Sequence, residues 1–261
     1  AFDPLELCFA GDDAGNAFAL WRERQTTSGA QPLWIARFNA ATDSWGAAVD
    51  VSQRGRAASL DVNARGDATA AWVDDATSGI YTTSYRAATD SWTPPAALPS
   101  ATGLTSAPAV VVDALGNATV IWRSNVNTLT QLRSAHYTSA TGTWTAALDL
   151  TPLEEQRSYV PHKAGIDASG RVTVAWTRWD LGARTIALYT ARWSPGATAW
   201  PAPTKLAEVA GFPNGSPDGI RTPTLAVGAT GDALAVWPEV SAGGATTTVK
   251  WAVQTAATGA W

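Results

Sequence analysis

The sequence predicts an all-β protein built from five four-stranded antiparallel sheets. Three observations lead to this prediction: a glycine turn set at a fixed distance before a tryptophan, a second polar turn that ends in another tryptophan, and the lack of any sustained 3.6-residue apolar period. Of the 261 residues, 46% are hydrophobic, so the chain can bury a core and is not a disordered segment.

The first mark of the repeat is a glycine six residues before a tryptophan. It occurs five times, and successive glycines are 51, 50, 54 and 61 residues apart. Asp or Asn stands three residues before the glycine in four copies, and Gly228 takes that place in the fifth. Glycine supplies the positive φ of a tight hairpin, and the Asp or Asn side chain bonds the turn's own backbone. The glycines are Gly15, Gly66, Gly116, Gly170 and Gly231, and the tryptophans are Trp21, Trp72, Trp122, Trp176 and Trp237.

The second mark is a short polar turn that ends in Trp45, Trp92, Trp144, Trp200 or Trp261. Between the marks lie runs of four to eight residues rich in Val, Ile, Thr and aromatic residues, which indicate strands. The first strand precedes the glycine turn, as in residues 57–62, and the second runs into the first tryptophan, as in 68–72. We expect third strands at 33–38, 80–86, 132–137, 186–193 and 247–254, and fourth strands at 47–51, 96–98, 146–150 and 203–206.

Four-stranded antiparallel units of about 40–50 residues, repeated along a chain, are the blades of a β-propeller. The fold class is therefore a five-bladed β-propeller, and we expect one domain over residues 1–261. The expected blades cover approximately residues 1–52, 53–100, 101–152, 153–208 and 209–261. The ten repeated tryptophans would fill the wedges between adjacent blades.

The last blade is incomplete in the sequence, because Trp261 stands where its fourth strand should begin. Residues 2–7 are the one candidate for a closing strand, but they lie too near Gly15 to leave room for a connection and a separate first strand. Three alternatives stay open: a three-stranded blade, further residues outside this sequence, or a strand exchanged with a neighbouring chain in an oligomer.

Composition excludes several classes of function. The net charge of −4 and the pI near 5.1 argue against nucleic-acid binding. No apolar run reaches the length of about 18 residues that spans a bilayer. Cys8 is the single cysteine, so no internal disulfide forms, and it reads as a small core residue. His136 and His162 lack neighbours at metal-ligand spacing, and no cofactor motif occurs, so we expect neither metal nor cofactor.

The chain begins at Ala1 and contains no methionine. We therefore expect a processed or excised piece of an exported protein.

The loops between second and third strands vary in length and chemistry, whereas the two repeated turns hardly change. Varied loops on one rim of a rigid scaffold are where binding usually resides, so that rim is the candidate face. Carboxylates, arginines and an aromatic ring suit a sugar or peptide site, and Trp179 reads as a loop aromatic. The candidate ligand-binding residues are Glu23, Arg24, Asp74, Asp75, Asn125, Arg178, Trp179 and Glu239.

The units resemble the tandem blade repeats, of the form DxxGNAxxxW…W, of bacterial exported β-propeller proteins. They are more distantly similar to five-bladed propeller lectins. The sialidase-type Asp-box is not matched, because the glycine and tryptophan stand in another spacing on another hairpin. The resemblance implies the architecture and a location outside the cytoplasm, in the periplasm, at the cell surface or secreted.

The expected function is a non-catalytic recognition module whose ligand is carbohydrate, as in a lectin. The main alternative is a protein-interaction scaffold or a subunit of a larger assembly. The third is a glycoside hydrolase, in which Glu23, Asp74 and Glu239 would supply the carboxylates.

Overall fold

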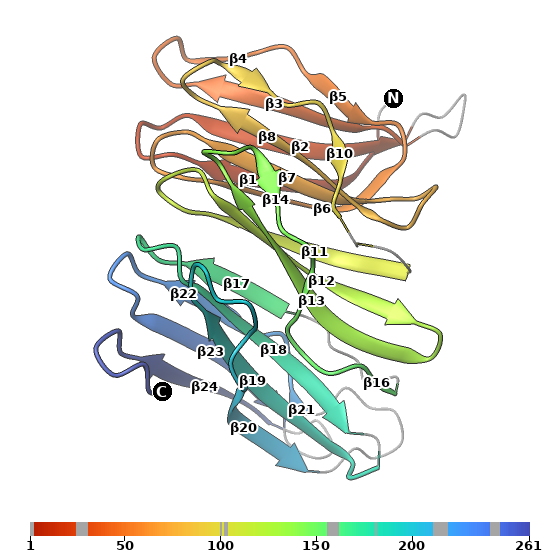
Figure 1. Cartoon of the computed structure of the whole chain (residues 1–261), viewed down its shortest axis with the longest axis vertical. Coiled ribbons are helices and arrows are strands. Elements are labelled where there is room, and N and C mark those ends of the chain that lie inside the picture. The colour runs from red at the N-terminus through yellow and green to blue at the C-terminus, as the bar shows by residue number, and fades with distance from the viewer. Residues whose placement is uncertain are drawn as a thin grey trace. The chain divides into compact units, whose positions relative to one another are not determined.

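The computed structural model describes residues 3–24, 31–99, 101, 104–155, 162–180, 182–210, 219–240 and 246–261. These residues form five antiparallel sheets and no helix, and Figure 1 shows the sheets following one another along the chain. Within the described ranges, no helix capable of crossing a membrane occurs. Contacts divide the chain into a first unit of residues 1–126 and 133–147 and a second unit of residues 127–132 and 148–261.

The first two sheets lie in the first unit and have the same plan. Three long strands form a meander, and a two-residue strand and a short fourth strand then both pair with the third long strand. The first sheet comprises β1 (Asp3–Gly11), β2 (Ala17–Arg24), β3 (Leu33–Asn39), β4 (Ser44–Trp45) and β5 (Val49–Ser52). The second comprises β6 (Gly55–Val62), β7 (Ala68–Asp74), β8 (Ile80–Arg86), β9 (Ser91–Trp92) and β10 (Ala96–Ala97).

The boundary between the units passes through the third sheet, and the fourth sheet lies in the second unit. The third comprises β11 (Leu104–Val112), β12 (Ala118–Val126), β13 (Leu129–Thr138), β14 (Thr143–Trp144), β15 (Leu148–Asp149) and β16 (Glu154–Glu155). The fourth comprises β17 (His162–Ile166), β18 (Val172–Asp180), β19 (Thr185–Trp193) and β20 (Thr204–Ala210), hydrogen-bonded in chain order.

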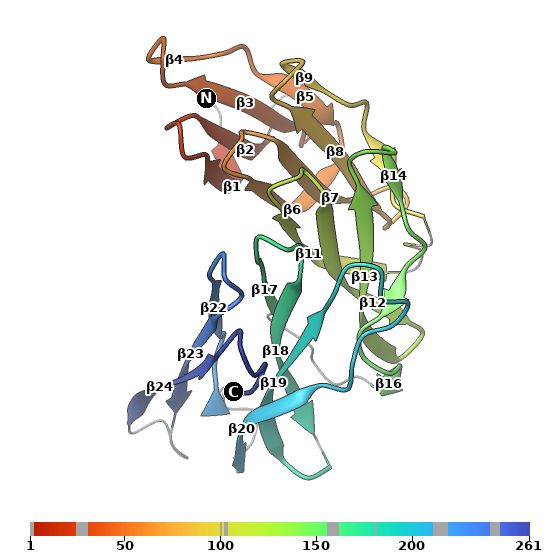
Figure 2. The same cartoon turned by 60° about the vertical axis from the view of Figure 1, so that its left-hand side comes forward.

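The fifth sheet has only three strand positions in the described part of the chain. Its first position is interrupted, because β21 (Gly219–Ile220) and β22 (Thr224–Val227) both pair with β23 (Ala233–Val240). The third position is β24 (Thr247–Gln254), which pairs with β23, as Figure 2 shows. The described part of the candidate closing segment, residues 3–7, is not a separate fourth strand: β1 runs from Asp3 through Gly11 and pairs with β2, so it is the first strand of the first sheet.

The glycine turns are hairpin turns, as expected. The repeat glycines have φ between 77° and 96°, a region that L side chains rarely adopt. In the third sheet, Asp113 Oδ1 accepts the backbone N–H groups of Leu115 (2.9 Å) and Asn117 (2.8 Å), and the N–H of Gly116 donates to the Asp113 carbonyl at 3.0 Å. The short polar side chain thus fixes the turn, and glycine provides its handedness.

In three repeats, the first tryptophan packs between its own sheet and the preceding sheet of the same unit. Trp72 lies in a cluster with Leu20 and Ile35 of the first sheet, and Trp122 in one with Val73 and Ile80 of the second. Trp237 likewise packs on residues of the fourth sheet. The second tryptophans are less buried than the wedge role predicts. Trp200 is buried, but Trp45, which pairs with Phe38 at the end of β3, is 50% exposed.

Second strands continue past the repeat tryptophan, because their antiparallel pairing with the third strands continues there; β8 and β24 have the predicted bounds, and the other third strands are longer than predicted. In the fourth sheet the register runs without a break from Val172 opposite Trp193 to Asp180 opposite Thr185. Residues 177–180, which follow the repeat tryptophan Trp176 and were expected in a loop, are therefore strand. The rim of the candidate face consists largely of strand ends.

Candidate functional site

The predicted site residues in the first unit lie at the ends of second strands. Glu23 is opposite Pro4 on β1, Asp74 is opposite Gly55 on β6, and Asn125 is opposite Leu104 on β11. Asp75 follows β7 directly. Each residue near this rim therefore has a first strand of its own sheet as its neighbour, and side chains of those first strands contribute to the site.

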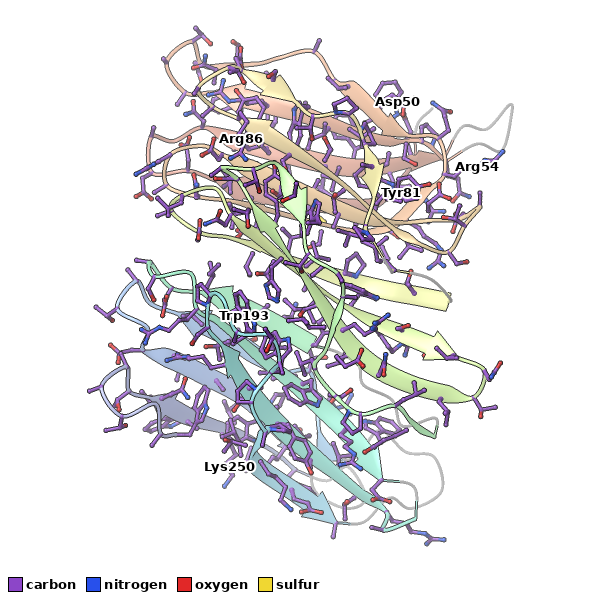
Figure 3. All side chains as sticks on the ribbon, viewed as in Figure 1. Asp50, Arg54, Tyr81, Arg86, Trp193 and Lys250 are labelled. Carbon is purple, nitrogen blue, oxygen red and sulfur yellow. The ribbon has the colours of Figure 1, made fainter. Side chains whose placement is uncertain are left out.

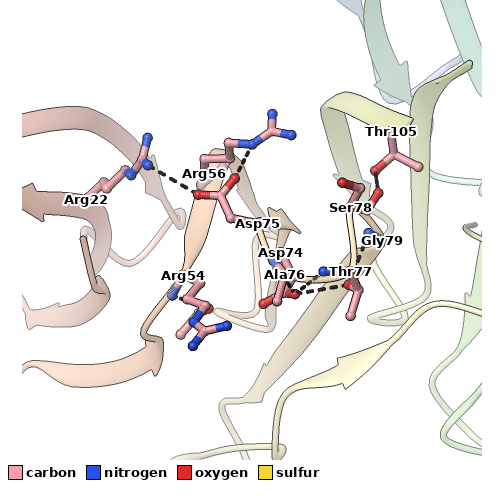
Figure 4. A network of polar contacts seen from close by, with 12 residues as sticks. Arg22, Arg54, Arg56, Asp74, Asp75, Ala76, Thr77, Ser78, Gly79 and Thr105 are labelled. Carbon is pink, nitrogen blue, oxygen red and sulfur yellow. Dashed lines mark hydrogen bonds and ion pairs between the residues drawn. The ribbon is translucent and has the colours of Figure 1, made fainter. Parts of the chain in front are cut away.

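Four charged side chains of the first unit form one ion-pair cluster at this rim. The Arg22 guanidinium lies between two carboxylates: Nη1 is 3.6 Å from Oε1 of Glu6, and Nη2 is 3.5 Å from Oδ2 of Asp75. Arg56 donates from Nε to the other oxygen of Asp75. Figure 4 shows Arg22 and Arg56 approaching Asp75 from two sides. We call Glu6, Arg22, Arg56 and Asp75 the Arg22 cluster.

The Arg22 cluster joins two sheets. Glu6 is on β1 and Arg22 on β2, whereas Arg56 is on β6 and Asp75 follows β7. The backbone holds it in place, because Glu6 Oε2 accepts the N–H of Ala58 at 3.2 Å and the N–H of Asp75 donates to the Arg54 carbonyl at 2.9 Å. Its side chains are therefore fixed by the packing of the first sheet on the second.

Irregular pairing in the first strands aims two of these side chains. The register of β1 with β2 shifts between Pro4 and Glu6, and that of β6 with β7 shifts between Arg56 and Ser59. Within the second shift, Ala57 has a positive φ of 50°. Bulges of this kind redirect a side chain out of the regular alternation and often lie next to active sites. Glu6 and Arg56 both stand at such a shift.

The Arg22 cluster is partly shielded from water. The Arg22 side chain is 15% exposed, whereas those of Glu6, Arg56 and Asp75 are 32%, 34% and 39% exposed. Nε of Arg22 is buried and has no hydrogen-bond partner among the described residues. Its guanidinium is therefore directed at the two carboxylates through Nη1 and Nη2.

Asp74, a predicted ligand contact, has a structural role. Its Oδ1 accepts the N–H groups of Ala76 (3.1 Å) and Thr77 (2.9 Å) and the Thr77 hydroxyl (3.0 Å), as Figure 4 shows. This carboxylate closes the turn between β7 and β8. Asp75, and not Asp74, is the acid that belongs to the Arg22 cluster.

The predicted residues of the second unit are also held by partners. Arg178 Nη2 lies 2.8 Å from Oε2 of Glu154, and Glu239 Oε1 accepts the indole N–H of Trp237 at 2.9 Å. Trp179 is not a loop aromatic: it lies in β18 opposite Ile186, is half-buried, and packs on the core shared by the fourth and fifth sheets. Extended pairing of β18 with β19 is the reason for this correction.

The structure brings one predicted residue, Asp75, together with three that sequence reasoning missed, namely Glu6, Arg22 and Arg56. The sequence signal that could have identified Arg22 is its place directly after the first repeat tryptophan. The acidic trio Glu23, Asp74 and Glu239 is divided between the two units. The Arg24 side chain lies outside the described residues.

His136, one of the two histidines, lies in β13. His136 is buried, with Nδ1 2.9 Å from the Thr119 hydroxyl and Nε2 3.2 Å from the Ser134 hydroxyl. Burial lowers the pKa of His136 to about 4. Across the described ranges, no group of three or more His, Cys, Asp or Glu residues is placed to hold a metal ion.

No protein-family model and no curated protein sequence matches this chain. Solved structures do match. A protein of unknown function from Dyadobacter fermentans has 12% identity and a TM-score of 0.59, over 98% of this chain and 80% of that one. The polysaccharide lyase Uly1 has 11% identity and a TM-score of 0.62, over 94% and 69% of the two chains. An α-L-arabinanase from Penicillium chrysogenum, complexed with arabinobiose, has 12% identity and a TM-score of 0.55, over 97% and 78%.

The likeness shows the fold, and the predicted five-bladed β-propeller class is confirmed. The expectation of a non-catalytic recognition module is wrong. Two solved structures that share this fold are named as enzymes, a polysaccharide lyase and an α-L-arabinanase, and neither is a lectin.

Proposed function

We propose that this chain is the propeller of a glycan-processing enzyme and that the Arg22 cluster is its active site. The observation that carries the proposal is Arg22, whose guanidinium contacts Glu6 and Asp75 at once. Both carboxylates touch one planar group, so they lie within about 10 Å of each other, which is the range of paired carboxylates in glycoside hydrolases.

The chemistry that suits this pair is hydrolysis of a glycosidic bond. One carboxylic acid gives its proton to the glycosidic oxygen as the bond to the sugar breaks, and the other carboxylate takes a proton from the water that attacks the sugar. Arg22 has no reacting atom in this scheme. It orients both acids, and its charge stabilises the carboxylate left after proton transfer.

The substrate of this proposal is a carbohydrate polymer met outside the bacterial cytoplasm. Glu23 and Asn125 lie near the ends of second strands of the same unit and are proposed substrate contacts, because hydroxyl groups of sugars bind carboxylate and amide groups. We propose that both units belong to one propeller domain, and we assign no substrate contact to Arg178, Trp179 and Glu239 of the second unit. We also propose that, in an oligomer, the neighbouring chain contacts the fifth sheet.

The test is cleavage of a panel of neutral and uronate-containing polysaccharides by the purified chain and by Arg22→Gln. Arg65→Gln is the matched control, because Arg65 lies in the exposed turn between β6 and β7. We expect new reducing ends from the wild type and the control, and a large loss in Arg22→Gln at unchanged melting temperature. No cleavage of any polysaccharide by the wild type would overturn the proposal. Products with an unsaturated sugar at the new chain end would show that the enzyme cleaves by elimination and not by hydrolysis.

A further inference from the structure

The bulge in β6 gives one residue, Ala58, an irregular place in the second sheet. Between Arg56 and Ser59 the register shifts by one residue, so that Ala57 and Ala58 together stand opposite Trp72. A bulge of this kind interrupts the ladder of hydrogen bonds between its strands. The backbone N–H and C=O groups of a buried bulge then need partners from outside the ladder.

Two side chains of β1 bind these backbone groups of Ala58. Oε2 of Glu6 accepts the N–H of Ala58 at 3.2 Å, and the Cys8 thiol donates to the carbonyl oxygen of Ala58, with Sγ 3.2 Å from that oxygen. Glu6 and Cys8 are two residues apart on one strand, so their side chains lie on the same side of it. One strand of the first sheet therefore holds Ala58 through both its N–H and its C=O.

The thiol of Cys8 is in the form that can donate this hydrogen bond. Burial, with a smaller effect from the charge of Glu6, raises the pKa of Cys8. A thiol with a raised pKa keeps its proton at neutral pH, so the S–H group stays a donor toward Ala58. Cys8 is half-buried and also packs beside the core cluster that contains Leu20 and Trp72.

The same part of the chain also holds the second acid of the Arg22 cluster. Arg54, labelled in Figure 3, lies directly before β6, and its carbonyl accepts the N–H of Asp75 at 2.9 Å. Arg56 donates from Nε to the Asp75 carboxylate. Residues 54–58 thus bind both acids, and the position of Ala58 sets where Glu6 stands relative to Asp75.

The third sheet shows that a bulge at this place does not itself require such a contact. The register of β11 shifts at the same point, opposite Trp122, and Pro108 stands there in the position of Ala58. Proline has no N–H and cannot donate to an acid. The N–H of Ala58 and the acid that accepts it are therefore features of the Arg22 cluster and not of the bulge as such.

We infer that Cys8 is a positioning residue for Glu6. Its thiol holds Ala58 by the carbonyl, and the N–H of Ala58 in turn holds the Glu6 carboxylate beside Arg22. The inference rests on the proposed function, in which Glu6 is one of the two reacting acids. Misplacing a reacting group slows the chemical step more than it weakens binding, so loss of the thiol should lower kcat and leave KM nearly unchanged.

The first test compares Cys8→Ala with Cys8→Ser on a polysaccharide that the wild type cleaves. Serine keeps a donor toward Ala58, and alanine does not. We therefore expect Cys8→Ala to lose roughly 5- to 50-fold in kcat and Cys8→Ser to retain most of the wild-type value. If Cys8 only packed beside the core, the polar serine would be tolerated no better than alanine. Equal kcat for Cys8→Ala and wild type, or equal losses in the two variants, would overturn the inference.

Ser59→Ala is the matched control. Ser59 has the register position in β6 that Cys8 has in β1, one residue before the repeat tryptophan on the opposite strand. Its hydroxyl accepts the N–H of Val110 at 3.1 Å and does not bind Ala58. Ser59→Ala should keep the wild-type kcat, and a loss as large as that of Cys8→Ala would show a general effect of loosening these first strands and would overturn the inference.

A second measurement reports the contact without turnover, namely the rate at which an aromatic disulfide reagent modifies Cys8 at pH 8. The thiolate is the reacting form, and both the charge of Glu6 and its hold on Ala58 keep the thiol protonated and in place. We expect roughly 2- to 10-fold faster modification in Glu6→Gln. Asp13→Asn, which removes an exposed acid of the same sheet, should leave the rate unchanged.

The two measurements separate this inference from the proposed function. Equal modification rates in Glu6→Gln and wild type would overturn the inference, whatever the chain cleaves. Faster modification in Glu6→Gln, together with no cleavage of any polysaccharide by the wild type, would support the contact between Cys8, Ala58 and Glu6 and overturn the proposed function.

Discussion

The backbone N–H of Val112 donates a hydrogen bond of 2.7 Å to Oδ2 of Asp61. Two residues earlier, the N–H of Val110 donates to the hydroxyl of Ser59 at 3.1 Å. Side chains of β6 thus satisfy backbone donors of β11, which belongs to the next sheet. The first strands of two sheets are tied by side chain to backbone, and one of the acceptors is the half-buried carboxylate of Asp61.

Burial raises the pKa of Asp61 from about 3.8 to about 6. Because the folded state favours the protonated acid, this contribution to stability is complete below about pH 4 and is lost as the pH rises through 6. Asp61→Asn keeps an acceptor for Val112 and carries no charge. We expect it to be more stable than wild type by ~1–2 kcal/mol at pH 7 and nearly equal at pH 4. Denaturant titrations at the two pH values measure this, and a constant offset would contradict it.

His136 changes stability in the opposite direction. Its pKa is lowered to about 4 by burial, so the neutral ring is the form that the fold accommodates. Its contribution is complete above about pH 6.5 and is lost as the pH falls through 4. In the Asp61→Asn background, stability should therefore fall by ~1–3 kcal/mol from pH 6.5 to 4. The added substitution His136→Gln should flatten that slope, and an undiminished slope would refute the assignment.

Gly116 should tolerate substitution less well than another glycine of similar conformation. Gly116 and Gly196 have φ of 77° and 82°. A Cβ at Gly116 would approach Arg86 Nη1 to 2.5 Å and Asp67 Oδ2 to 3.1 Å, whereas one at Gly196 would meet nothing within 4 Å. Both alanine variants incur positive-φ strain of about 1 kcal/mol, and Gly116→Ala should lose a further ~1–2 kcal/mol of unfolding free energy. Equal losses would show that the crowding at Gly116 relaxes freely.

The two sets of repeat tryptophans should differ in stability. Trp122 is fully buried in the cluster between the second and third sheets, and Trp45 is 50% exposed beside Phe38. We expect Trp122→Ala to cost ~3–5 kcal/mol, because it leaves a cavity, and Trp45→Ala to cost about 1 kcal/mol or less. Unfolding midpoints of the two variants measure this, and similar values would mean that Trp45 is covered in solution.

The sequence predicted those parts of the fold that depend on local chemistry and period. The turn at Asp113 and Gly116 needs a particular side chain and a positive φ, so both leave a mark in the repeat. The packing role of Trp72 and Trp122 follows from alternation along a strand. The irregular start of β1 was not predictable in this way, because the register of β1 with β2 shifts between Pro4 and Glu6 and no local pattern reveals that shift.

The candidate site was predicted less well, and the reason is physical. The rim of second-strand ends was identified, and with it Asp75, but Glu6 and Arg56 lie 16 and 34 residues from Arg22 in sequence. They join one cluster because two irregular first strands place Glu6 beside Arg22 and Arg56 beside Asp75, which depends on tertiary packing. Asp74 and Glu239 satisfied the charge pattern equally well and are engaged in turn capping and an indole hydrogen bond.

The turnover of Glu6→Gln and Asp75→Asn on a polysaccharide that the wild type cleaves tests the central claim most directly. Asp13→Asn is the matched control, because Asp13 is exposed in the glycine turn between β1 and β2. If the Arg22 cluster performs the chemistry, each of the two variants should lose roughly 10²–10⁴-fold in kcat with little change in melting temperature, and the control should lose nothing. Turnover within a few-fold of wild type in both variants would place the active site elsewhere on the propeller.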